Sequence, residues 1–150
     1  MTIRWLLAAL HILALPLGVA AVWMRARGFR ALSGSAERLS GVFAADGFWG
    51  LAALVWLGTG LPRAFAGFEK GADYYLGNGL FHAKLTLFGL IVLLELAPMI
   101  TLIRWRRQRR RGEAIDTSKA PTFARISEVQ AGLIVVIVLL ATAMARGIGG

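Results

Sequence analysis

Four long apolar segments decide what this chain can fold into. A bilayer core is about 30 Å thick, so an α-helix that crosses it needs roughly 20 mostly apolar residues. Four segments reach or approach that length, at residues 5–24, 44–64, 80–103 and 126–145. None shows the alternation of apolar and polar residues that a membrane strand requires. The sequence therefore predicts an all-α polytopic membrane protein, in which a bundle of four transmembrane helices forms one domain over residues 1–150.

The composition excludes the common alternatives to a membrane bundle. Hydrophobic residues make up 57% of the chain and charged residues 17%, whereas soluble domains contain about 45–50% and about 25%. No cysteine is present, which excludes disulfide scaffolds and thiolate metal or redox sites. The first segment could also be a cleaved signal peptide. Its apolar run is long, however, and Arg25, Arg27 and Arg30 follow it directly, so we expect it to be a transmembrane helix.

Basic residues are distributed unevenly between the two sides of the predicted membrane. Twelve lie in the connections between the first and second and between the third and fourth segments. The other side holds four, which are Arg4, Arg63, Lys70 and Arg146. Because positive charge stays on the cytoplasmic side, both termini are predicted to face outward, on the periplasmic side of a bacterial inner membrane. The basic run at residues 104–111 is then a topology signal and a contact for the lipid bilayer, and we expect no nucleic-acid partner.

Aromatic and small residues suggest how the helices are placed. Trp5, Trp23 and Trp105 fall near the ends of segments, where amphipathic rings sit at the membrane interface. Small residues allow transmembrane helices to approach closely. We assign that role to the four glycines of the second segment, which are Gly47, Gly50, Gly58 and Gly60.

Polar side chains within the segments are the candidates for function, because a charge at mid-bilayer costs at least ~2.5–3.5 kcal/mol. His11 lies roughly 9 Å below the outer surface and Lys84 roughly 6 Å, at 1.5 Å per helical residue. We expect these two side chains to face each other across the bundle. The stripe of Arg4, His11, Gly18 and Arg25 is polar or small and is predicted to face the other helices. Taken singly, His11 could be a hydrogen-bonded interhelical residue, and Lys84 could extend to the interface.

Two carboxylates and a second histidine complete the set of polar residues in or beside the membrane. Glu95 lies about three turns from Lys84 on the same helix face and should be either protonated or paired. Glu128 is expected to pair with Arg25, Arg104 or Arg125. It also begins a stripe that we predict to face inward, formed by Gly132, Val135, Leu139, Thr142 and Arg146. His82 is expected to be an interfacial residue.

The chemistry open to these residues is narrow. A neutral imidazole inside a helical bundle is a haem-iron ligand or a proton carrier, which makes His11 the candidate metal ligand. Met144 is the methionine that best matches its depth. Lys84, Arg63 and Lys70 could offset haem propionates or an acidic substrate. No phosphate-binding glycine loop, Ser-His-Asp set or carboxylate-rich metal site is evident in the sequence.

Three short motifs carry a resemblance to a known family. They are LLAALHI at residues 6–12, FHAKL at 81–85 and FARISEV at 123–129. The arrangement resembles the HemJ-type protoporphyrinogen oxidases, which are bacterial four-helix membrane proteins. Over nearly the whole chain it is similar to a related bacterial four-helix membrane family of unknown function, through residues 46–63, Lys70 to Lys84, Trp105 and the ending at 144–149. Leu94 and Glu95 stand where HemJ-type proteins carry a Tyr-His pair, and Gln130 stands where they carry a proline.

The resemblance implies that His11 ligates haem b and that Lys84 is the catalytic residue. Lys84 and Arg63 are also expected to help hold the cofactor, because their charges could offset its propionates. The leading hypothesis is a haem-b-associated redox protein with a His/Lys cavity near the periplasmic side. If it is an enzyme, it is an oxidoreductase acting on a porphyrinogen-like substrate. The alternative is a non-enzymatic accessory or assembly subunit of a larger membrane complex, and a homo-oligomer is also open. A small transporter or proton path using Lys84 and Glu95 is a third hypothesis.

Overall fold

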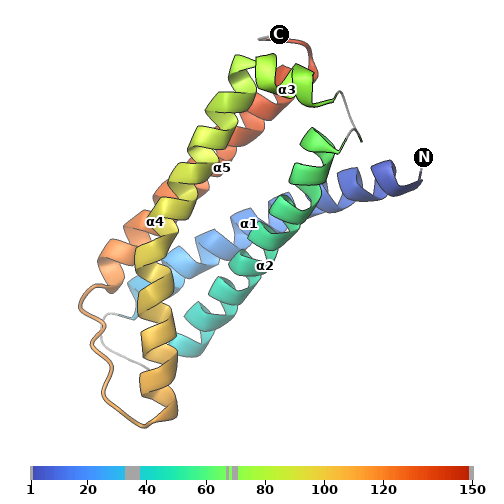
Figure 1. Cartoon of the computed structure of the whole chain (residues 1–150). Coiled ribbons are helices and arrows are strands. Elements are labelled where there is room, and N and C mark those ends of the chain that lie inside the picture. Colours follow the sequence, from blue (N-terminus) through green and yellow to red (C-terminus); the bar gives the residue numbers. More distant parts are fainter. Residues whose placement is uncertain (1, 33–37, 67, 69–70, 149–150) are drawn as a thin grey trace.

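The computed structural model describes residues 2–32, 38–66, 68 and 71–148, which form helices joined by short connections. The helices are α1 (Thr2–Ala31), α2 (Leu39–Phe65), α3 (Ala72–Gly77), α4 (Gly79–Arg110) and α5 (Ala120–Ala145) (Figure 1). All but the short α3 are long and apolar enough to cross a membrane. The prediction of four transmembrane helices is therefore confirmed, and each helix extends beyond its predicted segment at one end or both.

The four long helices are arranged as an open bundle. α1 packs against α2 and α5, and α4 packs mainly against α5. Both chain termini and α3 lie toward one end, here called the termini end (Figure 1). The opposite end is called the arginine end, because it holds residues 25–30 of α1 and 104–110 of α4. Which of these ends faces the cytoplasm remains a prediction from the charge distribution.

The largest apolar core lies at the arginine end. It contains Phe29, Leu32, Leu39, Val42, Leu102, Trp105, Ala120, Phe123 and Ala124. The rings of Phe29, Trp105 and Phe123 pack together with centroids 5.6 to 6.3 Å apart. Trp105 is only 3% exposed, so its predicted role at the membrane interface is wrong. Trp5, by contrast, is 69% exposed, as expected for an interfacial anchor.

The outer faces of the long helices are strongly apolar. Leu54 of α2, Leu93 of α4 and Leu139 of α5 are all highly exposed. Soluble monomers rarely expose contiguous apolar surface on this scale, whereas hydrocarbon accommodates it. The bundle is therefore built for a lipid environment.

Close approach of helices involves Gly18 and only one of the four glycines predicted for this role, Gly60. A Cβ atom added to Gly18 of α1 would lie 2.4 Å from the Trp56 ring of α2. A Cβ atom on Gly60 would lie 3.2 Å from Cε1 of His11. The other three predicted glycines have open space around them, and their assignment was wrong: Gly47, Gly50 and Gly58. They lie on exposed positions of α2, where no neighbouring helix in the described chain approaches.

Candidate functional site

His11 is fixed in place by a hydrogen bond between α1 and α2. Its Nδ1 atom lies 2.8 Å from Oγ1 of the buried Thr59. The Thr59 hydroxyl donates its own hydrogen to the carbonyl oxygen of Val55, at 2.5 Å. Because a hydroxyl has only one hydrogen, Nδ1 of His11 must be the donor in the first bond. The neutral ring then carries a free lone pair on Nε2, the state in which imidazole binds a metal.

Lys84 of α4 and Arg63 of α2 lie close enough to His11 for their charges to act on its ring. Arg63 likewise acts on Lys84. The Lys84 ammonium lies 5.4 Å from the centroid of the Phe81 ring, and in the described part of the chain it has no carboxylate partner. These three residues lie within electrostatic range of one another and are called the His–Lys cluster below. Direct contact of His11 with Lys84 across the bundle remains a prediction. Lys70, which was expected to join them, lies outside the described residues.

The other residues predicted for the termini end are close to this cluster in the fold. Met144 is buried against Ala64 and Phe81, and Phe81 is the ring beneath Lys84. His82 is exposed, and its Nε2 lies 2.8 Å from the carbonyl oxygen of Leu76, which agrees with an interfacial position. His82 therefore turns away from the cluster, although only two residues separate it from Lys84.

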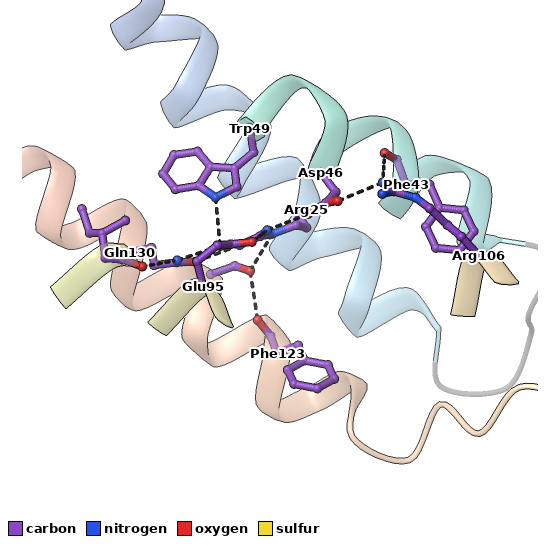
Figure 2. A network of polar contacts seen from close by, with 10 residues as sticks. Arg25, Phe43, Asp46, Trp49, Glu95, Arg106, Phe123 and Gln130 are labelled. Atoms are coloured by element: carbon purple, nitrogen blue, oxygen red, sulfur yellow. Dashed lines mark hydrogen bonds and ion pairs between the residues drawn. The ribbon is translucent and has the colours of Figure 1, made fainter. Parts of the chain in front are cut away.

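A second polar site, at the arginine end, was not predicted as such. Arg25 was counted among the charges that follow the first segment, while its stripe was predicted to face the other helices. Its side chain is 0% exposed, which agrees with the second expectation. Figure 2 shows it at the centre of a network that joins all four long helices. All five N–H donors of Arg25 are used. Nε donates to Ser127 at 3.2 Å, and Nη1 donates to Asp46 at 2.9 Å and to Glu95 at 2.6 Å. Nη2 donates to Glu95 at 2.7 Å and to Gln130 at 2.8 Å. These residues, with Trp49 and Arg106, are called the Arg25 network.

Glu95 accepts four hydrogen bonds within this network. Besides the two bonds from Arg25, its Oε2 accepts hydrogen bonds from Nε1 of Trp49 and Nε2 of Gln130, both at 2.9 Å. Of the two predicted states, protonated or paired, the structure shows the paired one. Four hydrogen bonds, two of them charge-assisted, engage this carboxyl group within the network. This occupancy argues against the hypothesis that Glu95 carries protons with Lys84.

Asp46 connects the buried network to the surface of the arginine end. Its second oxygen accepts a hydrogen bond from Nη2 of Arg106 at 2.9 Å, and the same nitrogen donates to the carbonyl oxygen of Phe43 at 3.1 Å. Two guanidinium groups and two carboxylates therefore balance each other's charge. Because paired charges and satisfied donors remove most of the penalty of burial, the network is tolerated between apolar helices.

Glu128 and the face of α5 differ from the prediction. Glu128 pairs with Arg30 at 2.5 Å, not with Arg25, Arg104 or Arg125. The predicted inward stripe of α5 is exposed at Gly132, Val135, Leu139, Thr142 and Arg146, so that assignment was wrong. The buried face instead includes Ser127, Gln130 and Ile134. Successive helical residues are rotated by about 100° around the helix axis. Because Ser127 and Gln130 face Arg25, Glu128 points along the flank of α5 and not toward Arg25.

The two sites differ in what they can do chemically. Every N–H donor of Arg25 is used within the protein, and Glu95 accepts four hydrogen bonds there, so the network holds helices together. The His–Lys cluster offers an unprotonated ring nitrogen and two cations. Within the described residues, no group of three or more His, Cys, Asp or Glu side chains could hold a metal ion. A metal ion bound at the cluster would therefore need most of its coordinating atoms from a non-protein group. Acidic substituents on that group would be favoured by the two cations.

Comparison with known proteins gives one match. A family model described as "Predicted membrane protein (DUF2214)" matches residues 3–149. No curated protein and no solved structure matches the chain. The match supports the membrane assignment and gives no link to HemJ-type enzymes, so that resemblance remains a prediction.

Proposed function

We propose that this chain, which belongs to the DUF2214 family of predicted membrane proteins, binds haem b at the His–Lys cluster and acts as a membrane redox protein. The observation that carries the proposal is the hydrogen bond of His11 Nδ1 to Thr59. It directs the Nε2 lone pair away from Thr59 and fixes the ring, as second-shell partners of metal-binding histidines do.

The donor set favours a porphyrin-bound iron over a bare ion. Structural and catalytic zinc sites use three or four protein ligands, and the described residues contain no such group. Haem needs a single proximal imidazole from the protein, because the porphyrin supplies the other four nitrogens. His11 alone is therefore sufficient for the iron.

The cations of the cluster fit the remaining chemistry of this group. Haem carries two carboxylate substituents, and Lys84 and Arg63 would hold them by charge. The haem would supply one-electron transfer when bound. Lys84, which lacks a carboxylate partner in the described chain, would also orient an acidic substrate. In its more specific form, the proposal is an oxidoreductase that acts on a porphyrinogen-like substrate.

An absorption spectrum of the detergent-purified protein tests the proposal. We expect a Soret band in the wild type, its loss in His11→Ala, and partial recovery of that variant on addition of imidazole. The matched control is His82→Ala, which removes the other histidine of the chain and should leave the band unchanged. A wild type without a Soret band, or with one that His11→Ala does not alter, would refute haem binding at this site. Co-purification of a stoichiometric partner without any cofactor would then favour an accessory subunit.

A further inference from the structure

A hollow at the arginine end is lined by Phe43 of α2 and by three arginines of α4, which are Arg106, Arg109 and Arg110. Among the residues that the structure describes, no acidic side chain lines it. We propose that this hollow binds the phosphate group of an anionic membrane phospholipid. The site is separate from the His–Lys cluster and does not depend on haem binding.

Arg106 is a prearranged part of the hollow. Its Nη2 atom is held by Asp46 and by the carbonyl oxygen of Phe43, and its guanidinium lies 5.1 Å from the Phe43 ring centroid. These bonds use only the two hydrogens of Nη2, so the N–H groups of Nε and Nη1 are left for a ligand. A guanidinium fixed in this way binds phosphate without the entropy loss of a mobile side chain.

Arg109 and Arg110 supply charge that the protein itself does not neutralise. Both are exposed, and neither has a carboxylate partner in the described part of the chain. Their neighbour Arg111, in contrast, lies 3.6 Å from Glu113. Asp46 already pairs with Arg106, so the uncompensated charge of the hollow belongs to Arg109 and Arg110. A bound phosphate would remove the repulsion between these two groups while forming charge-assisted hydrogen bonds.

The position of the hollow favours a lipid phosphate over a free one. α4 has 32 residues, about 48 Å at 1.5 Å per residue, so its last turns emerge from a hydrocarbon core about 30 Å thick. Ile103 is 49% exposed and precedes Arg106 by three residues and Arg110 by seven, which places all three on one helix face. An acyl chain along Ile103 would bring its headgroup phosphate to the arginines, with the Phe43 ring as the apolar wall.

Lipid titrations of the detergent-purified full chain, followed by native mass spectrometry, test the proposal. The probes are a phospholipid with a net negative headgroup, a zwitterionic phospholipid with the same acyl chains, and inorganic phosphate. We expect the anionic lipid to bind at least about tenfold more tightly than the zwitterionic one. Equal binding of the two lipids would overturn the proposal. Saturation by inorganic phosphate at the same concentration would also overturn it, because the site would then be a free-phosphate site.

A matched pair of variants locates the site. Arg109→Gln/Arg110→Gln and Arg104→Gln/Arg107→Gln each remove two charges from α4, but only the first pair lines the hollow. Both lose the same general attraction to anionic lipid. We expect the Arg109/Arg110 variant to bind the anionic lipid several-fold more weakly than the control variant, with equal thermal unfolding midpoints in lipid-free detergent. Equal affinities of the two variants would show that the basic run acts only as a diffuse charge.

Discussion

Arg25 of α1 and Glu95 of α4 bind each other through both pairs of terminal atoms, Nη1 to Oε1 at 2.6 Å and Nη2 to Oε2 at 2.7 Å. Parallel contacts of this kind are the strongest form of a guanidinium–carboxylate pair. α1 and α4 otherwise pack mainly on other helices. The pair therefore links two helices that apolar packing alone would leave weakly connected.

Removing one partner of this pair should destabilise the bundle strongly. In Arg25→Met, Glu95 and Asp46 lose their buried counter-charge, and breaking such a pair costs about 3–5 kcal/mol. Glu95→Leu should have a similar effect. The double variant should lose clearly less than the sum of the two, because neither buried charge is then left alone. Unfolding free energies from denaturant titration in mixed micelles measure this; strict additivity would show that the two groups do not interact.

The Trp49 side chain should stabilise the fold through the hydrogen bond of its indole N–H as well as through the packing of its ring. Trp49→Phe keeps an aromatic ring but leaves Oε2 of Glu95 without the bond from Nε1. We expect a loss of about 1–3 kcal/mol in unfolding free energy, as for other buried hydrogen bonds. Trp23→Phe is the matched control, because Trp23 is exposed and should change stability little. Similar losses in both variants would assign the effect to ring size.

Gly18 should be far more sensitive to substitution than the glycines of α2. Gly18→Ala places a methyl group against the Trp56 ring, and overpacking of this kind costs typically about 1–3 kcal/mol. Gly50→Ala meets open space and should be neutral or slightly stabilising, because alanine favours helix more than glycine does. Thermal unfolding in detergent compares the two; a tolerant Gly18 would mean that Trp56 moves aside at little cost.

The tautomer of His11 can be tested without any cofactor. Nitrogen NMR of protein labelled at histidine should show a protonated Nδ1 and an unprotonated Nε2 at neutral pH. Thr59→Val, which keeps the side-chain shape but removes the acceptor, should shift the population toward the Nε2–H tautomer. If haem binds, its affinity should fall by about 10–100-fold in the same variant, as for other second-shell changes. An unchanged spectrum would mean that Thr59 does not fix the ring.

The sequence predicted the number and position of the transmembrane helices because apolar length alone determines them. The stripe of Arg4, His11, Gly18 and Arg25 was also predicted to face the other helices. Gly18 and Arg25 are buried and His11 is half-buried, but Arg4 is exposed, so the prediction was wrong at the first turn of the helix. The inward face of α5 could not be read in the same way, because most of the helix is apolar on every side and its periodicity carries little information. Ser127 and Gln130 were the available signal, since a polar residue in an apolar segment needs a partner.

The Arg25 network was missed for a different reason. Counting about 20 apolar residues ends the first segment just before Arg25, whereas α1 continues to Ala31. Arg25 was therefore counted with the connection that follows, although its stripe was predicted to face the other helices, and its partner Asp46 was not singled out. Glu95 and Gln130 hydrogen-bond to each other and to Arg25. Neither partnership could be predicted once Arg25 had been assigned to the connection after the first segment.

The order in which the partners of Arg25 are synthesised constrains how this protein enters its membrane. Asp46 follows Arg25 by 21 residues and Glu95 follows it by 70. A nascent chain can therefore neutralise the arginine within its first helical hairpin, long before the rest of the network has left the ribosome. Of the two carboxylate partners, Asp46 is thus the first to become available to Arg25 during synthesis.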